Sequence, residues 1–167
     1  MKHTETRKTI INALLSLLEE MSFNDITVTD ITRRASISRM TFYRYFATKE
    51  AVVAAYIEQM ASVIQDEIAR QLSHFDFHEY FRIIFQYLNQ NRQLIQRVFQ
   101  TDFCGEILSC LNKVFLKTPQ EKFHLHLDKY RALMITGGFY NVLIEWLRSG
   151  MEESPESMAE LCSQMAV

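Results

Sequence analysis

The feature that most constrains this chain is a pair of short helices separated by a tight turn. Thr27-Val28-Thr29-Asp30 has the pattern of a capping box, in which two side chains satisfy backbone N–H groups at the start of a helix. The helix that follows extends to about Arg34, and Ala35-Ser36-Ile37 forms a turn. Ser38 is a favoured N-cap for the next helix, which covers residues 39–46.

A longer amphipathic segment precedes this pair and predicts a helix over about residues 4–21. Two short helices joined by a turn of three or four residues, and braced by a longer one, describe a helix-turn-helix. Thr48 caps a fourth helix, which extends to about Ile68. The apolar positions of the first helix that share one face are Ile10, Ile11, Leu14, Leu17, Leu18 and Met21.

The helix at 39–46 has one face for the core and one for a ligand. Phe42 and Phe46 are four residues apart, so they point the same way and fix the roll of the helix. The opposite face carries Arg, Thr and Tyr side chains, which suit base edges and phosphates in a major groove. The residues expected on this face, its flanks and its N-terminal end are Arg39, Met40, Thr41, Tyr43, Arg44 and Tyr45.

The charge distribution supports a nucleic-acid contact more than the net charge does. The net charge is −2, which alone argues against such a partner. Residues 1–50 hold 8 Lys and Arg against 6 Asp and Glu, whereas residues 51–167 hold 10 against 14. The stretch 32–49 contains five cationic residues and no acid. A basic face on an acidic body fits a local phosphate contact, although a solvated basic patch is an equally good interpretation of charge alone.

Four runs of residues follow one another at set spacings within residues 7–57. They are Ile26-Thr27-Val28-Thr29-Asp30-Ile31, Ala35-Ser36-Ile37-Ser38, Thr41-Phe42-Tyr43-Arg44-Tyr45-Phe46 and Lys49-Glu50. This combination resembles the DNA-binding signature of the TetR family, the tetracycline-repressor-like transcriptional regulators. The resemblance implies an all-α protein that binds double-stranded DNA as a homodimer.

The resemblance also implies a role for each matched position. The Thr residues that open the second helix would approach a phosphate or a base edge, and the start of the third helix would contact bases. Its Tyr residues would contact backbone and bases, and the Lys at the start of the fourth helix would bind phosphate. With Arg44 added for its exposed direction, the expected DNA-binding residues are Thr27, Thr29, Arg39, Met40, Thr41, Tyr43, Arg44, Tyr45 and Lys49.

Two positions depart from the family pattern. Ser36 and Met40 stand where the family often has Gly. If the turn requires a positive φ, Ser36 costs roughly 1 kcal/mol more than Gly there. Met40 changes the base preference, so the operator sequence is not predictable.

The rest of the chain predicts a helical body. Asp76-Phe77-His78-Glu79 is a second capping box, and Thr118-Pro119-Gln120-Glu121 opens a helix that can continue to Ser149. Gly150 would end that helix, and Ser154-Pro155 opens the last one. The prediction is an all-α chain of about eight or nine helices. Residues 1–50 form a helix-turn-helix head, and residues 51–167 form a regulatory and dimerisation body.

The last two long helices have the pattern of a dimer interface. Gly137-Gly138 within a helix costs about 2 kcal/mol of helix propensity against Ala, which close packing of a second helix would offset. Two copies of these helices would form a four-helix bundle. A kink or an intrachain contact is the alternative. The residues expected at the interface are Gly137, Gly138, Asn141, Val142, Trp146, Met158 and Leu161.

The body is rich in aromatic residues that fit a pocket for a small apolar effector. Ordinary core packing is the alternative, and for any single Phe it is the better interpretation. The residues expected to line the pocket are Phe81, Phe85, Phe99, Phe103, Phe115 and Phe139.

Several classes of function lack support. No apolar run approaches the roughly 20 residues that a membrane span needs, and the N-terminus has no signal-peptide pattern, so a cytoplasmic protein is expected. Cys104, Cys110 and Cys162 are too widely spaced for a metal site or a disulfide framework. No catalytic motif is present, so neither an enzyme nor a cofactor is expected.

The sequence therefore predicts a homodimeric regulator, most simply a repressor of a palindromic operator that a small effector releases. The alternative is an adaptor that keeps the fold but acts through a protein partner without binding DNA. Retention of Thr41, Tyr43, Arg44 and Lys49 favours DNA binding.

Overall fold

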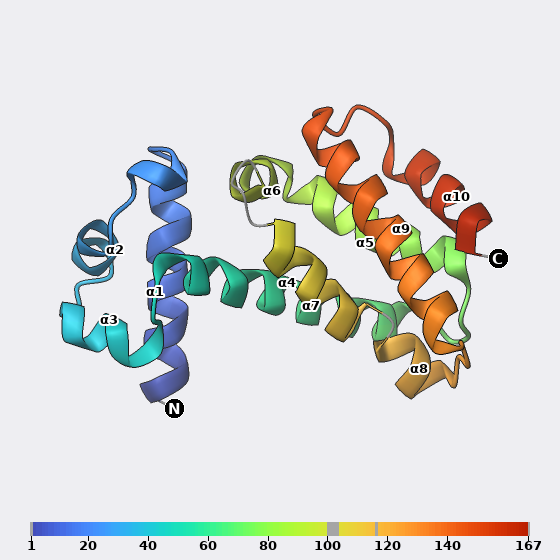
Figure 1. Cartoon of the computed structure of the whole chain (residues 1–167), viewed down its shortest axis with the longest axis horizontal. Coiled ribbons are helices and arrows are strands. Elements are labelled where there is room, and N and C mark those ends of the chain that lie inside the picture. The colour runs from blue at the N-terminus through green and yellow to red at the C-terminus, as the bar shows by residue number, and fades with distance from the viewer. Residues whose placement is uncertain (1, 100–103, 116, 167) are drawn as a thin grey trace.

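The computed structural model describes residues 2–99, 104–115 and 117–166, all of them in helices or connecting turns. The all-α prediction is confirmed. Helices α1, α2 and α3 form the head at one end of the molecule, and α5 to α10 form the body at the other (Figure 1). The elements are α1 (Lys2–Leu18), the 3-10 turn η1 (Phe23–Asp25), α2 (Val28–Arg34), α3 (Arg39–Tyr45), α4 (Lys49–Gln71), α5 (Phe77–Gln90), α6 (Arg92–Phe99), α7 (Cys104–Val114), α8 (Lys117–Phe123), α9 (Lys129–Arg148) and α10 (Pro155–Ala166).

The predicted caps of the head are present. The Thr27 hydroxyl accepts from the Asp30 backbone N–H (3.2 Å), and the Asp30 carboxylate accepts from the Thr27 N–H (3.0 Å). The Thr27 hydroxyl and backbone N–H both donate to the Asp30 carboxylate, which holds the pKa of Asp30 below its usual value. Ser38 Oγ accepts from the Thr41 N–H at the start of α3 (3.0 Å), and Thr48 Oγ1 accepts from the Ala51 N–H at the start of α4 (3.2 Å). Local sequence therefore fixes where each short helix begins.

Helix α4 belongs to two cores. Val52, Val53 and Ile57 on its N-terminal half pack with the head, whereas Ile64 and Ile68 on its C-terminal half pack with the body. The helix crosses from one end of the molecule to the other in Figure 1. The core of the head thus includes residues of α4 beyond residue 50. The domain boundary after residue 50 remains a prediction.

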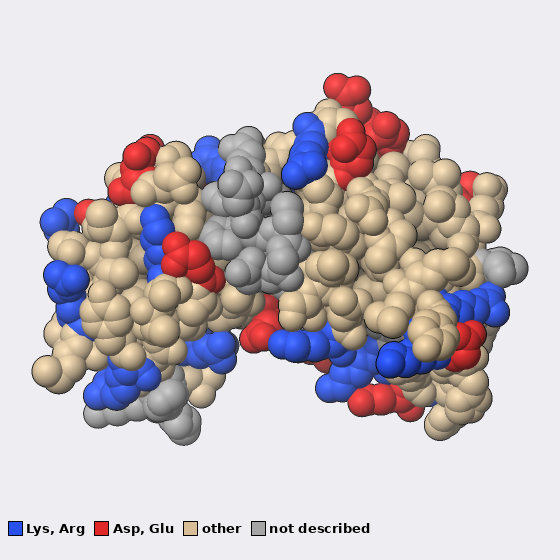
Figure 2. Space-filling model, in the orientation of Figure 1, with Lys and Arg blue, Asp and Glu red and all other residues tan. Residues whose placement is uncertain are grey.

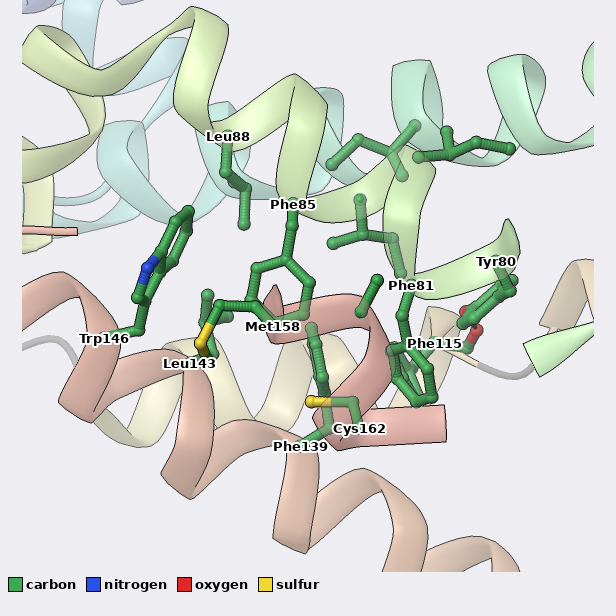
Figure 3. Close-up of a cluster of buried hydrophobic side chains, with 14 of the residues drawn as sticks. Tyr80, Phe81, Phe85, Leu88, Phe115, Phe139, Leu143, Trp146, Met158 and Cys162 are labelled. Carbon is green, nitrogen blue, oxygen red and sulfur yellow. Dashed lines mark hydrogen bonds between the residues drawn. The ribbon is translucent and has the colours of Figure 1, made fainter. Parts of the chain in front are cut away.

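Aromatic side chains fill the core of the body. The Phe139 ring lies 4.5 Å from Phe115, 5.5 Å from Phe81 and 5.8 Å from Phe85, measured between centroids. Trp146 meets Phe85 edge to face at 5.0 Å (Figure 3). These contacts join α5, the end of α7 and α9 into one packed cluster.

The helix expected to run from residue 118 to residue 149 is two helices. Helix α8 ends at Phe123, and His124 adopts a positive φ of 54°. Asp128 then caps α9, since its carboxylate accepts from the N–H groups of Tyr130 (2.9 Å) and Arg131 (3.0 Å). The prediction of one long helix was wrong because Asp128 is a second N-cap, which starts a new helix at Lys129.

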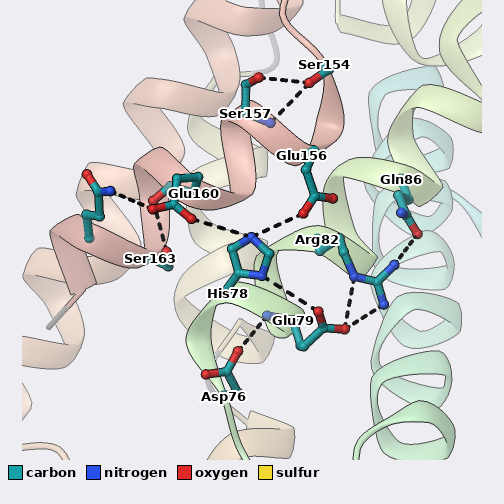
Figure 4. A network of polar contacts seen from close by, with 11 residues as sticks. Asp76, His78, Glu79, Arg82, Gln86, Ser154, Glu156, Ser157, Glu160 and Ser163 are labelled. Atoms are coloured by element: carbon teal, nitrogen blue, oxygen red, sulfur yellow. Dashed lines mark hydrogen bonds and ion pairs between the residues drawn. The ribbon is translucent and has the colours of Figure 1, made fainter.

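Helix α10 packs along α5, and a polar network marks the seam between them (Figure 4). His78 Nε2 lies 3.4 Å from a Glu156 carboxylate oxygen and 3.7 Å from one of Glu160. Arg82 pairs with Glu79 at 2.6 Å and holds the pKa of that carboxyl below its usual value. The network anchors the outer face of α10 while its apolar face packs on the aromatic cluster.

Two neighbouring serines at the α2–α3 turn give a stability test. Ser36 has a φ of 53°, the left-handed conformation expected from the departure noted above. Ser36→Gly should raise the free energy of unfolding by about 0.5–1 kcal/mol, because the steric strain at Cβ is removed. Ser38→Ala should lower it by about 1 kcal/mol, because the cap of α3 is lost. Urea denaturation of both variants checks the pair, and a destabilising Ser36→Gly would contradict the strain argument.

Candidate nucleic-acid interface

Helix α3 presents one face to the head core and the other to solvent. Phe42 and Phe46 are buried, as the sequence predicts. Met40 is 84% exposed and Tyr43 50%, and Arg44 is also exposed. Lys and Arg side chains lie at the end of the molecule that carries α2 and α3, and others lie along the lower edge of the body (Figure 2). The exposed face therefore combines cations with hydrogen-bonding and apolar groups.

Contacts inside the head hold several of these side chains in place. The hydroxyls of Ser38 and Thr41 lie 2.9 Å apart, so the N-cap orients Thr41. The Tyr43 ring meets the buried Phe42 ring edge to face at 5.5 Å, and the Arg44 guanidinium lies over Tyr45 at 5.3 Å. Side chains fixed in this way lose less conformational entropy when a ligand binds.

The two Thr residues at the start of α2 differ in availability. Thr27 Oγ1 donates to the Asp30 carboxylate (2.5 Å) and accepts from the Asp30 N–H, so the cap engages its hydroxyl proton. Thr29, two residues after this cap, is exposed. Of the two predicted contacts, Thr29 is the better placed, and Thr27 acts first as a structural cap.

The structure corrects the role expected for Lys49. Its ammonium donates to the backbone carbonyls of Phe23 (2.7 Å), Ile26 (2.8 Å) and Asn24 (3.3 Å), and it lies 4.3 Å from the centroid of the Phe23 ring. These bonds engage all three N–H donors. Lys49 therefore fastens the turn before α2 onto α4, and its ammonium is not directed at a phosphate.

Sequence reasoning missed Arg7. Its guanidinium lies 5.5 Å from the Phe46 ring, which places a cation of α1 beside the C-terminal end of α3. Arg7 is exposed, whereas Arg34 is engaged by Glu20 (2.7 Å) and Ser16. In the sequence, Arg7 is a basic residue that precedes the apolar positions of α1. Helical spacing does not predict its contact with Phe46, which is 39 positions away.

The aromatic residues expected to line an effector pocket lie in packed core, although Phe81, Phe115 and Phe139 also border open space. Phe81, Phe85, Phe115 and Phe139 are buried and contact one another directly. A cavity of about 50 Å³ remains beside Phe115 and Phe139, between α4, α5, α7 and α9. Phe103 lies outside the described residues, and so does the side chain of Phe99.

The expected dimer face is only partly at the surface. A Cβ built on Gly137 or Gly138 meets nothing within 4 Å, so neither glycine is needed for an intrachain contact. Leu161 and Asn141 are also exposed, and Val142 is half-buried. The exposed apolar residues nearby are Tyr130, Leu133, Met134 and Met165.

Trp146 and Met158 do not belong to that surface. Trp146 is 2% exposed, and its indole N–H donates to the Glu153 carbonyl at 3.1 Å. Met158 is buried in the same core. Helical spacing shows which residues share a face of a helix. It does not show whether neighbouring helices bury that face, so the prediction for Trp146 and Met158 was wrong.

Other candidate chemistry is not supported by the described residues. Burial raises the pKa of the Cys162 thiol to about 11 and also raises that of Cys110, which disfavours the reactive thiolate. Among residues 2–99, 104–115 and 117–166, no group of three or more His, Cys, Asp or Glu side chains is placed to hold a metal ion. Within the same ranges, no helix is both long and apolar enough to cross a bilayer.

Comparisons with known proteins agree with this geometry. A family model described as "Bacterial regulatory proteins, tetR family" matches residues 10–56, and one described as "Transcriptional regulator C-terminal region" matches residues 76–167. The dhaKLM operon transcriptional activator DhaS of Lactococcus lactis is 29% identical over 98 residues, which cover 58% of this chain and 50% of DhaS. The chain spans about half the length of the curated relatives it matches.

Two solved structures share the fold. The TetR family repressor AlkX from a Dietzia strain has a TM-score of 0.69 at 20% identity, covering 96% of this chain and 92% of AlkX. Thermus thermophilus FadR, solved in complex with lauroyl-CoA, has a TM-score of 0.66 at 19% identity, with the same coverage. At these identities, the likeness extends to the fold alone.

The position of Lys49 gives a direct test of its structural role. Lys49→Met should lower the free energy of unfolding by about 1–3 kcal/mol, because three carbonyls lose their donor. Lys8→Met, at an exposed position of α1, is the control and should change it by less than about 0.5 kcal/mol. Thermal and urea unfolding measure both. Unchanged stability combined with lost DNA binding in Lys49→Met would restore the phosphate role.

Proposed function

The chain belongs to the TetR family of transcriptional regulators, and we propose that it represses transcription by binding a palindromic operator as a homodimer until a small effector releases it. The exposed face of α3 carries this proposal. Phe42 and Phe46 anchor the helix, and its outer side chains project away from the core. A major groove of B-DNA admits a helix presented in this way.

The exposed side chains divide into two groups by position. Arg39, Met40 and Thr41 lie in the first turn of α3, the part of a recognition helix that contacts base edges. Tyr43 and Arg44 lie further along and contact the phosphate backbone in the proposed complex. Thr29 adds a contact from α2, and Arg7 extends the cationic track past the C-terminal end of α3.

The homodimer rests on the outer face of α9 and α10. Met134 is 67% exposed and Met165 63%, and both line an apolar groove of about 180 Å³ with Gly138 and Val142. Large apolar side chains around a groove favour burial against a second surface. The open space above Gly137 and Gly138 lets a partner helix approach closely. A two-fold axis here would direct two heads towards successive half-sites of one operator.

Repression is the simpler mode of regulation for this arrangement. Occupancy of an operator is sufficient to exclude other proteins from the same DNA, whereas activation needs a further contact. DhaS is named as an activator and AlkX as a repressor, so both modes occur among similar proteins. An adaptor that no longer binds DNA is not favoured, because the exposed face of α3 keeps its cations and hydroxyls. A regulator of chromosomal DNA acts in the cytoplasm.

The DNA contacts are tested with a duplex enriched from a random pool by the purified protein. Tyr43→Ala and Arg44→Ala should weaken binding to all duplexes, and Arg44→Ala, which removes a cation, should also reduce the slope of log K against log salt by up to about 1. Arg39→Ala should instead relax preference at one base pair by about 1–3 kcal/mol. Arg148→Ala, exposed on α9, is the charge-matched control and should bind like the parent protein. Equal binding by all four variants would contradict the proposed docking.

The dimer face is tested by analytical ultracentrifugation. Met134→Glu should raise the dimer dissociation constant at least about tenfold, because an unpaired carboxylate would be buried at the interface. Val63→Glu introduces the same charge at an exposed apolar position of α4 and should leave the dimer intact. An intact dimer in Met134→Glu would place the interface on another surface.

A further inference from the structure

The cavity of about 50 Å³ in the body is almost wholly apolar. Its wall includes Ile64, Ile84, Leu111 and the rings of Phe115 and Phe139. Gln65 on α4 contributes an amide to this wall. An amide among hydrocarbon side chains needs partners for its donors and its acceptor, so its hydrogen bonds determine what the cavity can hold.

One end of the Gln65 amide has no partner. Its side chain lies beside the phenol of Tyr80, whose O–H donates to the backbone carbonyl of Phe115. The Gln65 Oε1 atom is buried and has no hydrogen-bond partner among the described residues. Burial of Tyr80 raises its pKa, which keeps its single proton in place.

The hydrogen bond from Tyr80 to the Phe115 carbonyl determines which atom of the Gln65 amide lacks a partner. A phenol has one proton, and Tyr80 gives it to Phe115. The Tyr80 oxygen can therefore only accept from Gln65, so the amide NH₂ must face Tyr80. Exchanging the amide nitrogen and oxygen would set two acceptors against each other. The unpartnered group is consequently the carbonyl oxygen, which requires a donor.

From this orphaned acceptor we infer that the cavity binds the end of a neutral, amphipathic effector that carries a hydroxyl or N–H donor. The donor reaches Gln65 Oε1, and the hydrocarbon part of the molecule contacts the surrounding apolar side chains. The inference rests on the proposed function, in which the body receives a small effector. It revises the earlier expectation of a purely apolar one.

The uncharged lining and the small volume of the cavity restrict the class of effector further. None of the described residues that line the cavity is Lys, Arg or His, so a carboxylate or phosphate at this point would face the Gln65 carbonyl without a counter-charge from them. The volume is about a third of the roughly 150 Å³ that holds benzene in an engineered cavity. The cavity therefore accommodates the donor-bearing end and a few carbon atoms, and a longer effector needs side chains of the wall to move.

The cavity also borders the head. Ile57 and Cys110 line it, and both belong to the core cluster of the head. A molecule that enlarges the cavity would press on α4, which packs against α1, and on α7, which packs against α4. Binding at Gln65 thus has a direct mechanical route to the DNA-binding helices.

Two isomers of the same composition provide the test. 1-Butanol and diethyl ether have the same atoms and similar size, but only the alcohol has a donor. Both are titrated into the full-length protein while the methyl resonance of Met60, which lines the cavity, is followed by NMR. Met21, exposed after the C-terminal end of α1 and away from the cavity, is the internal reference. The parent protein should bind 1-butanol at least about fivefold more tightly than the ether.

Matched variants identify the acceptor. Gln65→Leu keeps the size of the side chain and should abolish the preference, and Gln65→Met is used if the leucine variant does not fold. Gln86→Leu, whose amide oxygen accepts from Arg82 outside the cavity, should retain it. Equal binding of the two isomers by the parent protein, a preference that survives in Gln65→Leu, or no shift of Met60 with either compound would overturn the inference.

Operator binding of the same preparations separates this inference from the proposed function. A protein that binds its selected duplex but does not discriminate the isomers would lose only the inference. A protein that discriminates the isomers but binds no duplex would lose the proposed function and keep the ligand site.

Discussion

The burial of Phe42 and Phe46 in the head core is the contact on which the DNA-binding surface depends. These two rings fix the roll of a helix that is too short to be stable alone. Once these rings are buried, the helical geometry directs the side chains of Met40, Thr41 and Tyr43 towards solvent. The cap at Ser38 then orients Thr41, and Phe42 supports the ring of Tyr43. A packing requirement inside the head therefore sets the chemistry of its outer face.

The core of the head includes side chains from helices of the body. Val98 of α6 and Cys110 of α7 pack into its core, and Arg97 donates to the Leu18 carbonyl at the C-terminal end of α1 (3.1 Å). Helix α4 is shared by both cores. A change in the packing of the body therefore cannot leave the head untouched, which is the physical basis for coupling an effector to DNA binding.

The parts of the fold that depend on local sequence were predictable. The caps at Thr27, Ser38 and Thr48 and the positive φ at Ser36 each follow from a few neighbouring residues. Contacts between distant residues were not. Lys49 binds carbonyls 23 to 26 positions away, and Trp146 is covered by Phe85 of α5 and donates to the Glu153 carbonyl. The aromatic residues of the body were recognised, but a pattern of apolar residues does not distinguish a cavity from a filled core.

The central claim, that the outer face of α3 lies against bases, is tested most directly by photocrosslinking. A photoreactive amino acid is placed at position 40, and in a control protein at position 63 of α4. With the selected duplex, the account predicts crosslinks from position 40 to bases of each half-site and none from position 63. Crosslinks from position 63 alone, or none from position 40 in a complex that forms normally, would contradict it.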